Sequence, residues 1–158
     1  MTRCYLDTNF LYAHLRTPAK ADERVDGWRD RVLASVAEGE GVMSALVIDE
    51  LAYRLVLAWL RDDGNKDPLA AYRAAPETIM QAMRQRLSAT WDALDSLTLE
   101  LEPTTRGVVE RAKQLMADPG LAPRDAFHGA HALHASCTAI ASSDDAFDRV
   151  PGLERLAP

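Results

Sequence analysis

The sequence has few of the features that mark specialised classes of protein. It holds two cysteines, Cys4 and Cys137, and both lie among apolar neighbours in predicted regular structure. We therefore expect buried, reduced thiols rather than a disulfide or a metal-binding pair. No apolar run approaches the roughly 18 residues that a membrane span needs. Residues 1–10 contain an arginine and an acid and do not resemble a secretory signal. These features predict a cytoplasmic protein without membrane contact.

An excess of positive charge is also missing. The formal net charge is −6, which argues against tight, nonspecific binding to duplex nucleic acid. It does not exclude a nucleic-acid enzyme whose acidic site holds divalent cations. The 158 residues are 47% apolar and 27% charged, as in an ordinary globular protein. Because no repeat or linker interrupts them, we expect a single domain over residues 1–158.

The first ten residues carry the strongest local pattern. Residues 4–6 are typical of a short buried strand, and Asp7, Thr8 and Asn9 follow at its carboxyl end. Phe10, Leu11 and Leu15 then recur at helical spacing. In open parallel sheets, ligands bind at the carboxyl ends of the strands, so Asp7 is a candidate metal ligand or nucleophile. The alternative is that Asp7 or Thr8 only caps the helix.

Short strand patterns alternate with longer helical patterns along the rest of the chain. Strands are predicted at residues 42–44, 97–101 and 138–141, with a last short strand within 152–156. Helices are predicted at about 22–38, 45–60, 67–96, 103–117 and 123–136, and residues 17–20 form a connector. This alternation predicts an α/β fold, a three-layer α/β/α sandwich with a mainly parallel central sheet.

That topology brings four acids to one edge of the sheet. Asp7 and Asp144 end strands, whereas Glu50 and Asp125 lie near the starts of helices. Four converging carboxylates would repel one another unless a cation lay between them. Mg²⁺ and Mn²⁺ are bound in proteins mainly by oxygen ligands. The sequence therefore predicts a divalent-metal site held by these four side chains, directly or through water.

The stretches around the four acids resemble the motifs of PIN-domain nucleases, and the VapC-like toxins of type II toxin–antitoxin systems in particular. The order and spacing of the motifs cover nearly the whole chain. They are Tyr5-Leu-Asp-Thr-Asn-Phe-Leu11, Ser44-Ala-Leu-Val-Ile-Asp-Glu-Leu51, Pro123-Arg-Asp-Ala-Phe-His-Gly-Ala-His-Ala-Leu133 and Ala141-Ser-Ser-Asp-Asp-Ala-Phe-Asp148. The segment of about residues 64–96 is longer than in compact family members and reads as a helical insertion.

The resemblance implies a Mg²⁺- or Mn²⁺-dependent endoribonuclease, a hydrolase acting on single-stranded or looped RNA. It also implies a cognate antitoxin that holds the enzyme inactive, and a homodimer. Metal activation of water would supply the chemistry. We expect Asn9 and either Ser142 or Ser143 to orient the acids.

Alternative interpretations remain for several residues. A phosphatase of the haloacid dehalogenase type needs a second acid two residues after the first, and Asn9 occupies that position. A PIN-domain nuclease that processes RNA without an antitoxin fits the same motifs.

The roles of several other residues are also predicted from their positions. We expect His128, with His131 and His134, to lie on a helix surface, and Asp145 to cap the turn through Phe147. The apolar stripe of residues 80–94 is either core or a groove for a second subunit or an antitoxin.

Overall fold

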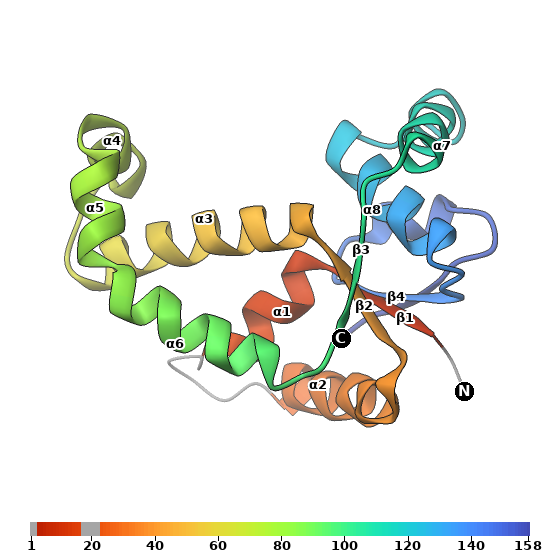
Figure 1. The fold of residues 1–158 in the computed structure, drawn as a ribbon, viewed down its shortest axis with the longest axis horizontal. Helices are drawn as coiled ribbons and strands as arrows, with labels where there is room; N and C mark the ends of the chain where they lie inside the picture. The colour runs from red at the N-terminus through yellow and green to blue at the C-terminus, as the bar shows by residue number, and fades with distance from the viewer. Residues whose placement is uncertain (1–2, 17–22) are drawn as a thin grey trace.

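The computed structural model describes residues 3–16 and 23–158 and has a parallel five-stranded sheet at its centre (Figure 1). Neighbouring strands pair in parallel throughout the sheet. Their order is β3 (Glu100–Glu102), β2 (Gly41–Ser44), β1 (Cys4–Leu6), β4 (Ala139–Ala141) and β5 (Glu154–Leu156). The predicted α/β class with a parallel sheet is confirmed. Because β1 is the central strand, the residues that follow it lie in the middle of the carboxyl edge.

The inner strands are apolar because both faces of the sheet are covered. All residues of β1, β2 and β4 are buried. Parallel sheets with helices on both faces have continuous hydrophobic strands of this kind. Cys4 and Cys137 are buried as expected, and burial raises the pKa of each thiol to about 12.

Helices follow the strands on both sides of the sheet. In Figure 1, α7 and α8 lie on one side and α2 lies on the other, while α3 runs away from the sheet. The bounds are α1 (Thr8–Leu15), α2 (Glu23–Ser35), α3 (Ala45–Asp62), α7 (Arg106–Ala117) and α8 (Pro123–His134). A π-helical turn, η1 (Val36–Glu40), follows α2 and contains Gly39 at φ 79°, a conformation that favours glycine. Among the described residues, no helix has the length and apolarity to cross a membrane.

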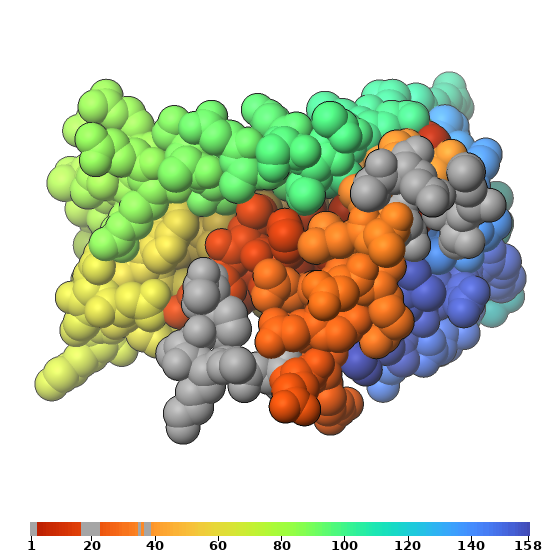
Figure 2. All heavy atoms as spheres, turned by 90° about the horizontal axis from the view of Figure 1, so that it is seen from below, coloured from red at the N-terminus to blue at the C-terminus, as the bar shows by residue number. Residues whose placement is uncertain are grey.

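Three further helices form an arm beside α3. They are α4 (Pro68–Ala74), α5 (Pro76–Ala82) and α6 (Arg84–Asp95), and α4 and α5 each begin with proline. Met83 and Leu87 pack against Val56 and Leu60 of α3. Figure 2 shows α6 along one border of the molecule, with α1 between it and α2. The helical pattern predicted for this segment is therefore confirmed, and part of its apolar stripe is core.

The third strand differs from the prediction. It covers Glu100–Glu102 rather than residues 97–101, and Leu101 is exposed whereas Glu102 is buried. The residues before it form a turn, with Thr98 at φ 49°. Oε1 of Glu102 lies 2.7 Å from Nδ1 of His134, so the buried acid has a polar partner that the sequence pattern did not reveal. The predicted connector at residues 17–20 lies outside the described residues.

Candidate active site

Asp7 is the most heavily hydrogen-bonded of the four predicted acids. It is the N-cap of α1, where Oδ1 accepts a hydrogen bond of 2.8 Å from the backbone N–H of Thr8. Oδ2 accepts hydrogen bonds from Ser142 Oγ at 2.6 Å and from Asn9 Nδ2 at 3.1 Å. The side chain is buried. Asp7 therefore caps the helix and also lies at the carboxyl edge of the sheet, so the two sequence interpretations are compatible.

Glu50 reaches the same place from α3. Its Oε2 accepts a hydrogen bond of 2.8 Å from the hydroxyl of Thr8, which links the two acids through one residue. Its Oε1 lies 3.1 Å from Nε of Arg124, at the start of α8. Although burial alone would raise it, the neighbouring His128 and the hydrogen bond from Thr8 hold the pKa of Glu50 below its usual value. The neighbouring Asp49 is exposed, because adjacent residues of a helix point about 100° apart.

His128 lies inside the site, and the expectation that it decorates a helix surface is wrong. It is 2% exposed, and its Nε2 lies 3.1 Å from Oε2 of Glu50. Its Nδ1 lies 3.0 Å from the hydroxyl oxygen of Tyr5, which in turn lies 2.7 Å from Oγ of Ser44. The reason is geometric: His128 is three residues after Asp125, so both project from one face of α8, toward the sheet edge. His131 is also buried, whereas His134 is largely exposed.

Asp7, Glu50 and His128 form a group able to hold a metal ion. One donor atom from each lies within 4.8 Å of the others, and Nε2 of His128 is 3.7 Å from Oδ1 of Asp7. Two carboxylates and an imidazole are a common donor set for divalent cations. The hydrogen bonds from Thr8, Asn9 and Ser142 orient the carboxylates, as the residues behind a metal ligand do. This donor set therefore fits a divalent cation.

Asp125 borders this group. Burial and then the negative charges of Asp144, Asp7 and Glu50 raise the pKa of Asp125, while His128 opposes the shift. Asp125 is therefore exposed to the charges of the other three acids, and the group of Asp7, Glu50 and His128 is the part that the structure brings into metal-binding distance. A cation among them would relieve this repulsion.

Asp144, rather than Asp145, has the predicted capping role. Oδ1 of Asp144 accepts a hydrogen bond of 2.9 Å from the backbone N–H of Ala146 and caps the 3₁₀ helix η2 (Asp145–Arg149). Asp145 is exposed inside that helix, so the prediction that it is the cap is wrong. Asp144 is the cap because its backbone is extended, which is typical of an N-cap residue. Its half-buried carboxylate also lies near Asp125.

The two candidate serines are now distinguished. Ser142 is buried, donates to Asp7 and accepts a hydrogen bond of 3.1 Å from the backbone N–H of Asp144. Ser143 is exposed. Sequence reasoning also missed Tyr5, Ser44 and Arg124 as members of this network. Tyr5 of β1 is in register with Val42 of β2, and its hydroxyl reaches Ser44 two residues further along β2, a contact that appears only once the strand register is known.

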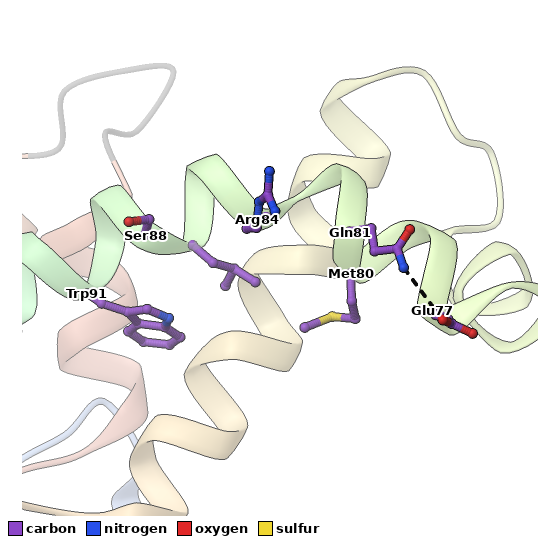
Figure 3. A pocket seen from close by; sticks show the side chains of 7 residues that line it. Glu77, Met80, Gln81, Arg84, Ser88 and Trp91 are labelled. Carbon is purple, nitrogen blue, oxygen red and sulfur yellow. Dashed lines mark hydrogen bonds between the residues drawn. The ribbon is translucent and has the colours of Figure 1, made fainter.

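A hollow lies on the helical arm, away from these acids. It is a cavity of about 490 Å³ between α5 and α6, lined by Glu77, Met80, Gln81, Arg84, Leu87, Ser88 and Trp91 (Figure 3). Met80 and Trp91 provide apolar walls, and Glu77 accepts a hydrogen bond from Gln81. It contains none of the predicted acids and offers no arrangement for hydrolysis.

Comparison with known proteins identifies the family of the chain. The family model of the PIN domain matches residues 4–153. Over 75 residues, the chain is 36% identical to the VapC ribonuclease Mb1869c of Mycobacterium bovis and, equally, to the ribonuclease VapC13 of Mycobacterium tuberculosis. Each match covers 47% of this chain and 57% of the relative, little more than half of its length.

Solved structures share the fold at lower sequence identity. The structure of FitAcB from Neisseria gonorrhoeae has a TM-score of 0.55 and 21% identity, covering 96% of this chain and 95% of that chain. The structure of VapBC2 from Rickettsia felis, bound to a DNA fragment from its promoter, has a TM-score of 0.56 and 15% identity, covering 96% of each chain. At these identities the likeness concerns the fold.

Proposed function

The chain belongs to the PIN-domain family, and from this premise we propose that it is a divalent-metal-dependent endoribonuclease and the toxin of a toxin–antitoxin pair. The observation that supports the activity is the convergence of Asp7, Glu50 and His128 within 4.8 Å, with Asp125 and Asp144 beside them. The names of the curated relatives, both VapC ribonucleases, favour RNA as the substrate.

In this proposal Asp7, Glu50, Asp125 and Asp144 hold Mg²⁺ or Mn²⁺, directly or through water. The chemistry that such a cation supplies when bound is a more acidic water and charge neutralisation at the phosphate. Ser142 and Asn9 keep the Asp7 carboxylate in one orientation. Thr8 does the same for Glu50, so both carboxylates are held before substrate binds.

The substrate and partners follow from the same reasoning. Single-stranded or looped RNA suits the site because its phosphates are accessible and its bases unstacked. Arg124 is exposed at the rim, where a cation can contact the RNA backbone. The structural relatives are toxin–antitoxin complexes, which favours an antitoxin partner here. We include in the proposal a homodimer, a cytoplasmic location, and one PIN-like domain over residues 1–158 with α4–α6 as an insertion.

RNA cleavage by the purified protein tests the activity. We expect cleavage of single-stranded RNA with Mn²⁺ or Mg²⁺, none with EDTA, and a loss of at least about 1000-fold in Glu50→Gln, as expected when a group that organises catalysis is removed. Asp49→Asn is the matched control, because Asp49 is the adjacent acid on α3 and is exposed. Metal-independent cleavage, or full activity in Glu50→Gln, would contradict the proposal.

Growth of a bacterial host tests the biological role. Expression of the wild type should slow growth, expression of Glu50→Gln should not, and co-expression of the neighbouring small open reading frame should restore growth. An active nuclease that is harmless, or that no partner inhibits, would favour RNA processing without an antitoxin. The phosphatase alternative lacks support, since Asn9 donates to Asp7 where that chemistry needs a second acid.

A further inference from the structure

We propose that His128 is itself a metal ligand through Nε2, and that it makes the site prefer a divalent transition-metal ion such as Mn²⁺ over Mg²⁺. The inference rests on the proposed function, because it concerns the same site. It goes beyond the four carboxylates by naming a nitrogen ligand and the ion that this ligand favours.

The position of Nε2 is the first argument. Neighbouring ligands of an octahedral ion with bonds of about 2.1 Å lie about 3 Å apart. Nε2 of His128 is 3.1 Å from Oε2 of Glu50 and 3.7 Å from Oδ1 of Asp7. Both distances are close to this spacing, and one donor atom from each of the three residues lies within 4.8 Å of the others.

The other ring nitrogen supplies the second argument. A ligating Nε2 carries no proton, so the neutral imidazole must carry its proton on Nδ1. Nδ1–H then donates to the hydroxyl oxygen of Tyr5 at 3.0 Å, and the Tyr5 hydroxyl donates to Oγ of Ser44 at 2.7 Å. All three side chains are buried, and each polar atom along this path has a partner. The chain therefore satisfies and orients the tautomer that coordination requires.

The rival interpretation uses the opposite tautomer. Nε2–H would donate to Glu50, and Tyr5 would donate to Nδ1, leaving His128 as a residue that only positions Glu50. The two interpretations differ in what lies on Nε2 when metal is bound. Coordination by imidazole nitrogen strengthens binding of first-row transition ions, whereas Mg²⁺ retains oxygen ligands. The ion preference therefore distinguishes them.

Metal binding by the full chain provides one test. Affinities for Mn²⁺ and Mg²⁺ are measured by calorimetry for the wild type, His128→Asn and His131→Asn. Asn at 128 keeps a polar group near Tyr5 but removes Nε2. His131 is the matched control because it lies one turn along α8, is equally buried and bonds Thr104 instead. We expect His128→Asn to lose at least about tenfold in Mn²⁺ affinity, the lower end of losses caused by disturbing residues behind a ligand. Mg²⁺ affinity should change less, and His131→Asn should match the wild type.

Pulsed electron paramagnetic resonance of bound Mn²⁺ provides a second test, whose main readout uses the wild-type protein. The wild type should show coupling to a directly bound nitrogen, and ¹⁵N-histidine labelling should shift that coupling. His131→Asn should retain it, and Tyr5→Phe should weaken Mn²⁺ binding by about 10- to 100-fold because Nδ1–H loses its acceptor.

The outcomes separate this inference from the proposed function. Mn²⁺ that binds without a nitrogen coupling, with an unchanged Mn²⁺-to-Mg²⁺ ratio in His128→Asn, would overturn the role of His128 and leave the nuclease proposal standing. If neither ion binds the wild type, both fail. If His128→Asn does not fold, the nitrogen coupling in the wild type alone decides.

Discussion

The hydroxyl of Ser142 lies 2.6 Å from Oδ2 of Asp7 and joins the ends of two neighbouring strands. Asp7 follows β1 and Ser142 follows β4, so this hydrogen bond sets the carboxylate at the centre of the sheet edge. The same oxygen of Ser142 accepts a hydrogen bond from the backbone N–H of Asp144. One buried hydroxyl thus positions two of the predicted acids.

Replacing Ser142 should therefore reduce activity and stability more than replacing the neighbouring Ser143. We expect Ser142→Ala to lower RNA cleavage by about 10- to 100-fold, as residues behind metal ligands do. It should also lower the free energy of unfolding by about 1–3 kcal/mol, because the backbone N–H of Asp144 loses its partner. Ser143→Ala is the control and should resemble the wild type in both rate and urea denaturation. Equal effects of the two substitutions would show that the hydroxyl is not positioning Asp7.

Asp144 combines a cap with a place in the acidic group, and two substitutions separate these roles. Asp144→Asn should keep the cap of η2, because asparagine caps helices as well as aspartate does. It should still lose most cleavage activity and most stabilisation by Mn²⁺. Asp144→Ala should in addition lower stability by about 1 kcal/mol. Cleavage assays and thermal melts of both variants, beside Asp145→Asn, measure this. Normal cleavage by Asp144→Asn would assign it the capping role alone.

Metal binding should appear as thermal stabilisation. A ligand that binds only the folded state stabilises it by mass action, by about 2.7 kcal/mol at 100 times its Kd. Mn²⁺ should raise the melting temperature of the wild type and raise it much less in the double variant Asp7→Asn, Asp125→Asn. Asparagine at position 7 can retain the cap of α1, but its NH2 group cannot accept the hydrogen bonds of Ser142 and Asn9, so each shift is measured from the variant's own metal-free melting temperature. Equal shifts in both proteins would indicate a cation bound elsewhere.

The repulsion at Asp125 should make metal-free stability depend on pH. Burial and neighbouring acids raise the pKa of Asp125 above its ordinary value of 3.8. The ionised form therefore disfavours folding at neutral pH, and this penalty disappears as the pH falls below 3.8. In EDTA, Asp125→Asn should melt higher than the wild type near neutral pH, with a difference that shrinks on acidification. Asp49→Asn provides the control, and a difference that grew in acid would contradict the assigned sign.

The sequence was sufficient for the α/β class and the parallel sheet. Short apolar runs and helical stripes are local, so β1, β2 and β4 were predicted within a residue or two. The third strand was misplaced because its inward residue is Glu102, an acid whose partner His134 lies on a distant helix. Alternation of apolar and polar residues cannot reveal such a pair.

The environment of His128 and the cap at Asp144 were mispredicted for a related reason. Whether a histidine on α8 faces solvent or the sheet edge depends on the orientation of the helix about its own axis where it packs on β1 and β2. That orientation follows from contacts between elements far apart in the chain. The choice between Asp144 and Asp145 depends on the residue at which β4 stops being extended, a boundary that propensities place only approximately.

The central position of β1 also has a consequence for synthesis of the protein. Asp7 leaves the ribosome well before Ser142, which orients it and follows 135 residues later. β1 cannot complete its pairing until β4 is made, so an unfinished chain has the first acid but no assembled edge. For the proposed nuclease, this order means that the edge carrying Asp7 is assembled only after β4 and Ser142 have been synthesised.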